Sequence, residues 1–352
     1  MEIYKSLIIG SSYLVIIISL VPLIRHDYWI FRVCEYPRLQ KLFINITLLL
    51  LLLVFYGINN TSDQIVGLML FLNTGYLSYQ VFPFTVFGKK QLHSAKKHHP
   101  KKQIGLFIGN VYQYNRKADE YLKCIASKNP DLIVLVETDM WWAEKLEILK
   151  KKYPYQLLAP SENTYGMMLF SKFELQDEKV KFLVEDEIPS VHTIIKLPSG
   201  DLINFHGLHP TPPVPQENPR STERDKEILL IGKEAKKSKY PVIVAGDLND
   251  VAWSYTTELF SKISGLLDPR KGRGFFNTFH AKYLFLRFPL DHVFCSNDFT
   301  LIDIQRMPNC GSDHFPMYIK LQYSPEEAVR QEEPEADQED KKTAREKINK
   351  PT

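Results

Sequence analysis

The sequence predicts a layered α/β sandwich that follows a group of transmembrane helices. Three apolar stretches within residues 1–88 are long enough to cross a bilayer, which takes about 20 residues of helix. From residue 104 to residue 323, apolar strands alternate with amphipathic helices, a pattern typical of sheets covered by helices. Acidic, amide and histidine residues stand where several of those strands end.

The composition allows one large domain and a smaller part. The chain has 352 residues, of which 44% are hydrophobic, enough for a full core. A net charge of +3 is too small to indicate a nucleic-acid partner by itself. Cys34, Cys124, Cys295 and Cys310 lie far apart without paired spacing. They therefore predict free thiols and neither a zinc site nor a disulfide framework.

The three apolar stretches predict a membrane domain at residues 1–88. Residues 7–24 carry only four polar side chains, residues 42–58 contain an unbroken leucine block, and residues 65–87 carry no charge. A cleaved signal peptide would explain the first stretch alone, but no small-residue cleavage pattern follows it and two more stretches do. A buried hairpin in a soluble core is the alternative for the other two. Apolar runs of this length favour three transmembrane helices.

Basic residues predict the orientation of the chain in the membrane. The first connection carries Arg25, Arg32, Arg38 and Lys41, whereas residues 59–64 carry no lysine or arginine. Six lysines follow the third apolar stretch. Because basic loops are enriched on the cytoplasmic side, we expect the large C-terminal domain to be cytoplasmic.

Two charged segments flank that domain. Residues 89–103 are basic and predict a juxtamembrane linker lying against anionic headgroups. A metal site built from His98 and His99 is the alternative, although adjacent residues in a flexible tract seldom converge on one ion. Residues 324–352 are rich in charged residues and nearly free of large apolar ones, so we expect a disordered tail.

Within residues 104–323 the elements follow from periodicity. Short apolar runs predict strands, and helical spacing predicts helices that begin near Ala118, around Trp142 and at Ser221. A Pro-Ser-Gly-Asp turn predicts one hairpin. The expected strands are residues 106–108, 132–136, 191–196, 202–206, 241–245, 293–295 and 315–321.

Polar residues mark the ends of these strands. Strand ends at one edge of a sandwich bring together residues that are distant in sequence, so we expect them to converge. These residues are Asn110, Glu137, His209, Asp247, Asn249, Asp291, His292, Asp313 and His314.

Several short motifs around these positions occur in a characteristic order. They are Gly109-Asn110-Val111, residues 130–137, residues 166–171, His209-Pro210, Gly246-Asp247-Leu248-Asn249, residues 290–293 and Ser312-Asp313-His314. In these motifs and in their order, the sequence resembles the endonuclease/exonuclease/phosphatase superfamily of divalent-metal phosphohydrolases. The resemblance implies a four-layer α/β sandwich, with two packed mixed sheets flanked by helices, over residues 104–323. Residues 207–213 and 247–254 are most similar to its bacterial membrane-associated branch, which implies the bacterial inner membrane.

The resemblance also implies roles for the matching positions. Glu137, Asn110 and Asp313 would bind Mg²⁺ or Mn²⁺, since hard cations prefer oxygen ligands. For Glu137 alone, a solvated strand end would be the simpler interpretation.

The remaining positions would act on water and phosphate. Asp247 would orient or deprotonate the attacking water, and Asn249 would hold that water or donate to a phosphate oxygen, although Gly-Asp-Leu-Asn is also an ordinary turn sequence. Asp291 and His314 would form a carboxylate–imidazole pair. His209 would donate to a phosphate oxygen.

Other residues near these motifs leave alternatives open. His206 is the alternative to His209, while His292 is expected to pack beneath the site and Ser312 to support the turn. One of Trp141 and Trp142 is expected in the core, and the other is left open.

Together these features predict a membrane-anchored, metal-dependent phosphoesterase that hydrolyses phosphodiester, nuclease-like, or phosphomonoester bonds. Its partners would be a phosphate-ester substrate, either nucleic acid or a lipid headgroup, and membrane lipids. A phospholipid or phosphoinositide hydrolase is the alternative, and a catalytically inactive membrane scaffold is the alternative of another class. No insertion of the kind that opens duplex DNA is recognisable, so nuclease activity does not follow from the fold. The substrate, the number of metal ions and the oligomeric state stay open.

Overall fold

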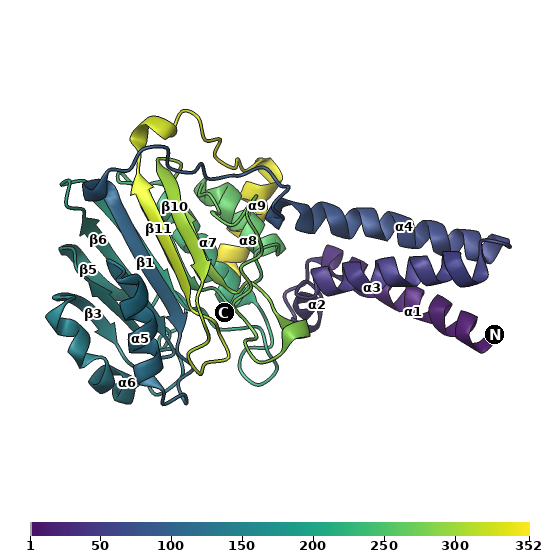
Figure 1. The fold of residues 1–352 in the computed structure, drawn as a ribbon, viewed down its shortest axis with the longest axis horizontal. Coiled ribbons are helices and arrows are strands. Elements are labelled where there is room, and N and C mark those ends of the chain that lie inside the picture. Colours follow the sequence, from purple (N-terminus) through teal and green to yellow (C-terminus); the bar gives the residue numbers. More distant parts are fainter. Residues whose placement is uncertain (1) are drawn as a thin grey trace.

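Three long helices project together from one end of a two-sheet domain in the computed structural model, which describes residues 2–352 (Figure 1). They are α1 (Glu2–Leu20), α3 (Arg38–Leu51) and α4 (Thr61–Val81). Each continues into a short turn of other helical type: η1 (Val21–Ile24), η2 (Leu52–Tyr56) and η3 (Phe82–Phe84). With these turns, all three are long and apolar enough to cross a membrane.

The helical group buries polar side chains among apolar ones and exposes large apolar side chains on its outer surface. Asn45 donates to the carbonyl oxygen of Leu70 at 2.8 Å and accepts from Asn73 at 2.8 Å. Large apolar side chains such as Phe43 and Phe71 are exposed on the outer surface. This inverted pattern suits a lipid environment, where polar side chains hold helices together.

The C-terminal domain contains two mixed sheets. The six-stranded sheet has the order β10-β11-β1-β2-β4-β3, and the five-stranded sheet has the order β5-β6-β7-β8-β9. Among the strands of residues 2–352, β1–β2 and β7–β8 pair in parallel and the other strand pairs are antiparallel. The strands are β1 (Gln103–Asn110), β2 (Leu132–Val136), β3 (Tyr155–Ala159), β4 (Met167–Ser171), β5 (Leu175–Lys181), β6 (Ser190–Lys196), β7 (Leu202–Leu208), β8 (Val242–Asp247), β9 (Asp291–Cys295), β10 (Phe299–Arg306) and β11 (Met317–Tyr323).

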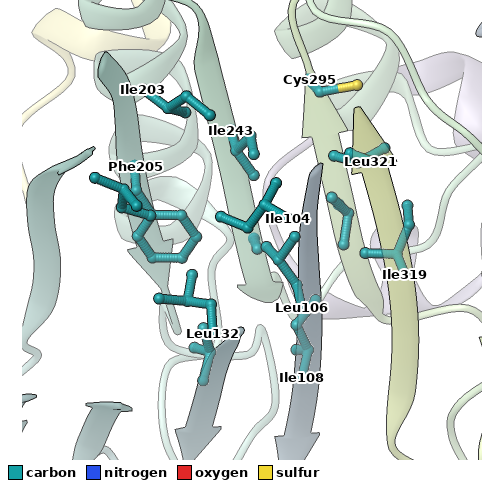
Figure 2. Packing of buried hydrophobic residues seen from close by; sticks show 14 of the residues in the cluster. Ile104, Leu106, Ile108, Leu132, Ile203, Phe205, Ile243, Cys295, Ile319 and Leu321 are labelled. Atoms are coloured by element: carbon teal, nitrogen blue, oxygen red, sulfur yellow. The ribbon is translucent and has the colours of Figure 1, made fainter. Parts of the chain in front are cut away.

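The two sheets pack face to face over one apolar core. Figure 2 shows Ile104 and Leu106 of β1 facing Ile203, Phe205 and Ile243 of the other sheet, and all five are fully buried. Full burial of such a side chain stabilises the fold by about 1.5–3 kcal/mol. Among the hydrophobic clusters of the domain, this one contains the most buried residues.

Helices cover the outer faces of both sheets. α5 (Ala118–Lys128), α6 (Met140–Lys145) and η5 (Glu147–Lys151) pack on the six-stranded sheet. α7 (Thr222–Lys236) and α8 (Tyr255–Ser264) pack on the five-stranded sheet. The expected four-layer sandwich is therefore confirmed.

The expectation of a disordered tail at residues 324–352 is wrong. The segment forms η7 (Pro325–Glu327) and α9 (Gln338–Asn349), which begins with a capping box at Asp337. Ala344 is fully buried against α7 and α8, and the Lys347 ammonium lies 2.6 Å from the carboxylate of Asp225. The charged composition does not reveal this helix, because its docking depends on an ion pair between Lys347 and a buried carboxylate on α7.

Residues 89–103 do not form a free linker either. Leu92 is fully buried in the core between the sheets, and the Ala95 amide donates to the carbonyl oxygen of Leu301 on β10 at 2.8 Å. The segment ends in η4 (Pro100–Lys102) and enters β1 at Gln103. Within residues 2–352, the one His, Cys, Asp and Glu group compact enough for a metal does not include His98 or His99.

The first connection of the helical group folds onto the C-terminal domain. It contains the short helix α2 (Trp29–Val33), and the Trp29 amide donates to the carbonyl oxygen of Pro219 at 2.8 Å. Arg32 is buried and donates to the hydroxyl of Thr256 at 2.9 Å. The helices and the sandwich are thus joined by side-chain contacts as well as by the chain itself.

Candidate active site at the strand ends

Most of the polar residues expected at strand ends meet at one rim of the sandwich. The parallel register pairs Asn110 with Val136, which puts Asn110 beside Glu137. In the other sheet, antiparallel β8 and β9 pair Asp247 directly with Asp291. His314 reaches the same place from the loop that precedes β11.

Hydrogen bonds link these side chains across the two sheets. The amide nitrogen Nδ2 of Asn110 donates to Glu137 Oε1 at 2.7 Å and to Asp247 Oδ2 at 3.1 Å. The His314 ring lies between two carboxylates, with Nδ1 2.8 Å from Asp291 Oδ2 and Nε2 3.5 Å from Asp247 Oδ2. One amide and one imidazole therefore join three carboxylates into a continuous cluster.

The backbone around the cluster takes conformations that position these side chains. Gly246 has φ 147°, and a Cβ there would lie 2.0 Å from the carbonyl oxygen of Leu208, so only glycine fits. Glu137 and Asn249 have φ 59° and 49°, which is uncommon for non-glycine residues. The fold maintains this local strain where the functional side chains must turn inward.

Asn249 is held on both sides of its turn. Its backbone amide donates to Asp247 Oδ1 at 2.9 Å, and its side chain donates to the carbonyl oxygen of Pro210 at 2.9 Å. Asn249 therefore fixes the orientation of the Asp247 carboxylate, and its own amide group lies at the turn that follows His209.

The electrostatics of the cluster favour a charged imidazole. Burial by itself would lower the pKa of His314, but the carboxylates of Asp291 and Asp247 outweigh it and raise that pKa to about 10. Burial would raise the pKa of Asp247, whereas His314 and His209 act in the opposite direction and the net shift is downward. At neutral pH the site therefore combines an ionised Asp247 with a protonated His314.

The acidic residues fit a hard divalent cation. Burial raises the pKa of Glu137 to about 7, and the nearby Asp313 adds to this shift. Within residues 2–352, no lysine or arginine forms an ion pair with Glu137, Asp313 or Asp247. Glu137 and Asp313 thus keep carboxylate oxygens without a basic partner, whereas Asp247 is paired with His314. Carboxylate and amide oxygens are the ligands that Mg²⁺ and Mn²⁺ prefer.

His209, and not His206, belongs to this rim. His209 directly follows β7, is buried, and experiences the charges of both Asp247 and His314. Burial lowers its pKa to about 4, so its ring is neutral, and its Nδ1 has no hydrogen-bond partner. By contrast, His206 Nδ1 lies 2.7 Å from Nδ1 of His192 on the neighbouring strand.

Several supporting residues were not singled out from the sequence. The Tyr121 hydroxyl donates to the carbonyl oxygen of Asn110 at 2.6 Å, and Thr278 Oγ1 accepts from the Asp291 amide at 3.1 Å. Ser312, expected at the turn, donates to the same Asn110 carbonyl at 2.8 Å and accepts from the His314 amide at 2.9 Å. Tyr121 was visible only as a core residue of a helix, and nothing in the sequence marks Thr278.

His292 and the tryptophans lie outside the reactive rim. His292 is fully buried, with Nε2 2.8 Å from the carbonyl oxygen of Asp250 and Nδ1 2.7 Å from Arg270, as expected for a residue beneath the site. Trp142 is fully buried in the core, whereas Trp141 is half-buried.

The first connection of the helical group reaches the site from outside the sandwich. The Tyr36 hydroxyl donates to the carbonyl oxygen of Asn249 at 2.9 Å, and Arg224 Nη1 donates to the same oxygen at 2.7 Å. Sequence patterns gave no signal for either contact, because Tyr36 and Asn249 are far apart in the chain.

The fold and this cluster define a protein with a phosphoesterase-like architecture. The model of the Endonuclease/Exonuclease/phosphatase family matches residues 108–314, more than half of the chain, and the chain belongs to this family. Members of this family are hydrolases that act on phosphate esters. No curated protein sequence matches the chain.

Solved structures share the fold at low sequence identity. An endonuclease/exonuclease/phosphatase protein from Beutenbergia cavernae superposes with a TM-score of 0.52 and 13% identity, covering 64% of this chain and 72% of its own. D. rerio TDP2 complexed with single-strand DNA product gives a TM-score of 0.52 and 16% identity, with coverages of 62% and 99%. The human Nocturnin catalytic domain with bound sulfate gives 0.50 and 15%, with coverages of 64% and 96%.

Proposed function

We propose that this protein is a membrane-anchored, divalent-metal-dependent phosphoesterase that hydrolyses phosphodiester or phosphomonoester bonds by attack of water. The observation that carries this proposal is the continuous hydrogen-bonded cluster of Asn110, Glu137, Asp247, Asp291 and His314. A scaffold without activity has no need for strained backbone and buried charges at one rim.

Glu137, Asn110 and Asp313 would hold Mg²⁺ or Mn²⁺ through their oxygens. When bound, the cation would neutralise negative charge on the phosphate. The Asn110 amide keeps Glu137 and Asp247 at a fixed separation, because it donates to both carboxylates.

The other side chains act on the water and on the phosphate. Ionised Asp247 orients the attacking water and accepts its proton, and the Asn249 side-chain amide lies at the adjacent turn. Protonated His314, oriented by Asp291, donates to a non-bridging oxygen as negative charge develops there. Neutral His209 offers its unpartnered ring nitrogen to a second phosphate oxygen.

The membrane part of the proposal rests on the three apolar helices. The basic first connection and the catalytic domain lie at the same end of these helices, since Tyr36 bonds to Asn249. Basic segments favour the cytoplasmic face, so we place the catalytic domain in the cytoplasm and the helices in a bacterial inner membrane.

Hydrolysis of a soluble diester tests the activity. Full-length protein in detergent is assayed on bis-(p-nitrophenyl) phosphate with Mg²⁺, Mn²⁺ or a chelator. We expect metal-dependent turnover that falls by about 10²–10⁴-fold in Asp247→Asn and His314→Gln. The matched controls Asp186→Asn and His98→Gln, both at exposed positions, retain full turnover. Equal rates in all variants would contradict the assignment.

A second candidate, phospholipid hydrolysis, is favoured by one exposed apolar loop. The loop consists of Tyr283 and η6 (Leu284–Leu286), and Phe285 is 81% exposed. Gln40 in the first turn of α3 donates to the carbonyl oxygen of Phe285 at 2.8 Å, which places the loop at the start of an apolar helix.

The same loop adjoins the catalytic rim. The Ala281 amide donates to the carbonyl oxygen of Asp313 at 2.6 Å, and the Phe279 ring centre lies 5.0 Å from that of His314. Apolar side chains between the membrane end and the site suit a substrate that resides in the bilayer.

Paired assays distinguish this candidate. In Leu284→Ser/Phe285→Ser, we expect hydrolysis of phospholipid in vesicles to fall at least tenfold while hydrolysis of the soluble diester is unchanged. Phe182→Ser, which removes an exposed aromatic ring elsewhere, affects neither. Equal losses on both substrates would reject a lipid-specific role of the loop.

A further inference from the structure

A cavity of about 340 Å³ lies where the ends of α1 and α4 meet the catalytic domain. Its walls include Leu23 after α1, Tyr76 and Tyr79 of α4, Trp253 just before α8, and Tyr255 at the start of α8. None of Asn110, Glu137, His209, Asp247, Asn249, Asp291, Asp313 and His314 lines it. The cavity is therefore distinct from the catalytic rim and needs its own explanation.

Arg38 is the unusual residue in this cavity. Its side chain lines the wall and is only 7% exposed, yet within residues 2–352 it forms no hydrogen bond or ion pair. Two other buried arginines nearby are paired: Arg32 with Glu35, and Arg224 with both Asp225 and Asp250. A guanidinium carries five donors and cannot lose its charge, so an unpartnered one in a cavity calls for an anion.

The charges of Glu35 and Glu258 act on Arg38, but within residues 2–352 no carboxylate on the wall contacts its guanidinium. Asp268 is engaged by Arg270 at 2.8 Å, and Glu258 lies 3.5 Å from Lys262. Glu35 accepts from Arg32 at 3.4 Å, and burial raises its pKa, which favours its neutral form.

Two further cations face the cavity without a strong carboxylate partner. The Arg25 guanidinium lies 4.3 Å from the ring centre of Tyr255, and its nearest carboxylate, on the exposed Glu339, is 3.7 Å away. Lys271 lies 5.9 Å from the ring centre of Phe84 and forms no ion pair among residues 2–352. Arg25, Arg38 and Lys271 therefore bring three cations to the wall beside aromatic rings.

The location identifies the kind of anion. The cavity lies at the ends of helices that are apolar enough to cross a membrane. If these helices span a bilayer, their ends lie near the lipid headgroups. Tyr79 is 82% exposed and Leu23 is exposed beside it, so the wall continues onto the apolar outer surface of α1 and α4. Tyrosines with basic side chains at such a level are typical of the membrane interface.

We propose that this cavity binds the phosphate headgroup of an anionic phospholipid, with Arg38 as its main partner and Arg25 and Lys271 supporting it. The acyl chains lie along the exposed apolar faces of α1 and α4. Because the walls come from both the helices and the catalytic domain, the bound lipid holds the two parts together. This site is independent of the hydrolytic activity.

Thermal unfolding of the full-length protein in a neutral detergent tests the proposal. Phosphatidylglycerol, phosphatidylcholine and soluble glycerol 3-phosphate are added separately, and native mass spectrometry counts the lipids retained. We expect phosphatidylglycerol to raise Tm in proportion to the logarithm of its concentration and phosphatidylcholine to have a much smaller effect. Arg38→Gln loses most of that rise, whereas Lys90→Gln, which removes an exposed juxtamembrane charge outside the cavity, retains it.

Other outcomes overturn the proposal. Equal lipid retention by Arg38→Gln and the wild type would show that Arg38 does not bind the headgroup. Equal effects of the two lipids on Tm would show that the site does not prefer anionic lipids. Stabilisation by glycerol 3-phosphate without any by phosphatidylglycerol would show a soluble-anion site. If Arg38→Gln does not fold, Lys271→Gln replaces it, with a partial loss expected and full retention counting against the site. No readout uses catalysis, so an inactive enzyme leaves the test intact.

Discussion

At the scale of single residues, Asn110 has the most connections in the candidate active site. Its side chain donates to Glu137 and Asp247, and its carbonyl oxygen accepts from Tyr121 and Ser312. Asn110 ends β1 in one sheet and donates to Asp247 at the end of β8 in the other sheet. Its side-chain amide therefore sets the distance between two carboxylates that would otherwise repel each other.

Replacing Asn110 tests this role. Asn110→Ala removes both donors, so we expect kcat to fall by about 10²–10³-fold, the range found for loss of one preorganised donor. The soluble-diester assay with saturating metal measures it. Asn204→Ala is the matched control and keeps its kcat, because Asn204 lies near the end of β7 that is away from the candidate active site. An unchanged rate in Asn110→Ala would refute the central position of this amide.

A second residue-scale prediction concerns the buried pair His192 and His206. Burial, with the neighbouring His206, lowers the pKa of His192 to about 2, and burial lowers that of His206 to about 4. In the unfolded chain both titrate near about 6.5. Between about pH 6.5 and pH 4 the unfolded state therefore binds more protons, and stability falls as the pH falls, by up to about 1.4 kcal/mol per pH unit for each histidine.

Melting curves at pH 7 and pH 4.5 measure this effect. His192→Gln removes one of the two titrating rings, so we expect its Tm to fall less on acidification than that of the wild type. His98→Gln, at an exposed position, falls as much as the wild type. The same acid sensitivity in all three proteins would show that other groups are responsible.

At the scale of elements, the connection that contains α2 links the helical group to catalysis. It contributes Tyr36 to the carbonyl of Asn249 and the carbonyl oxygen of Glu35 to the indole N–H of Trp253, at 3.0 Å. Tyr36 does not reach the reacting atoms and is a positioning residue. It acts through Asn249, whose amide holds Asp247.

Tyr36→Phe isolates this contact because it removes only the hydroxyl. We expect kcat to fall about fivefold, which corresponds to about 1 kcal/mol, with KM nearly unchanged and Tm lower by at most a few degrees. Tyr28→Phe, in the same connection and with no hydrogen bond from its hydroxyl, leaves kcat unchanged. A fall in Tm with an unchanged kcat would assign Tyr36 a purely structural role.

At the scale of the whole molecule, the helices and the sandwich behave as one assembly. The turn between α3 and α4 lies at the far end of the helical group from the sheets (Figure 1). If the helices cross the membrane, this turn and the catalytic domain are on opposite sides, and the absence of basic residues from the turn places it outside.

Cysteine labelling tests this arrangement. In a Cys34→Ser background, a membrane-impermeant maleimide is expected to label Asn59→Cys in intact cells, and Lys342→Cys only after lysis. Both positions are exposed, and the other three native cysteines are buried. The reverse labelling pattern would place the catalytic domain outside the cytoplasm.

The sequence by itself predicted the apolar helices, most strands and the residues at their ends, because periodicity and turn chemistry are local. It did not predict β3, β4, β5 or β10. Of these, β3, β5 and β10 are edge strands and only partly buried, whereas β4 is fully buried and was noted only as a motif. Edge strands lack the continuous apolar run that marks a central strand such as β2.

Only the tertiary structure shows that the charged segments are ordered and packed on the domain. Polar composition predicts disorder when no partner is known, yet Lys347 meets Asp225, Tyr36 meets Asn249, and Leu92 enters the core. These contacts join residues far apart in sequence, so they stabilise their segments only after the sheets have brought both partners together. Local patterns cannot contain that information, and this is the physical reason why the strand ends were predictable and the supports around them were not.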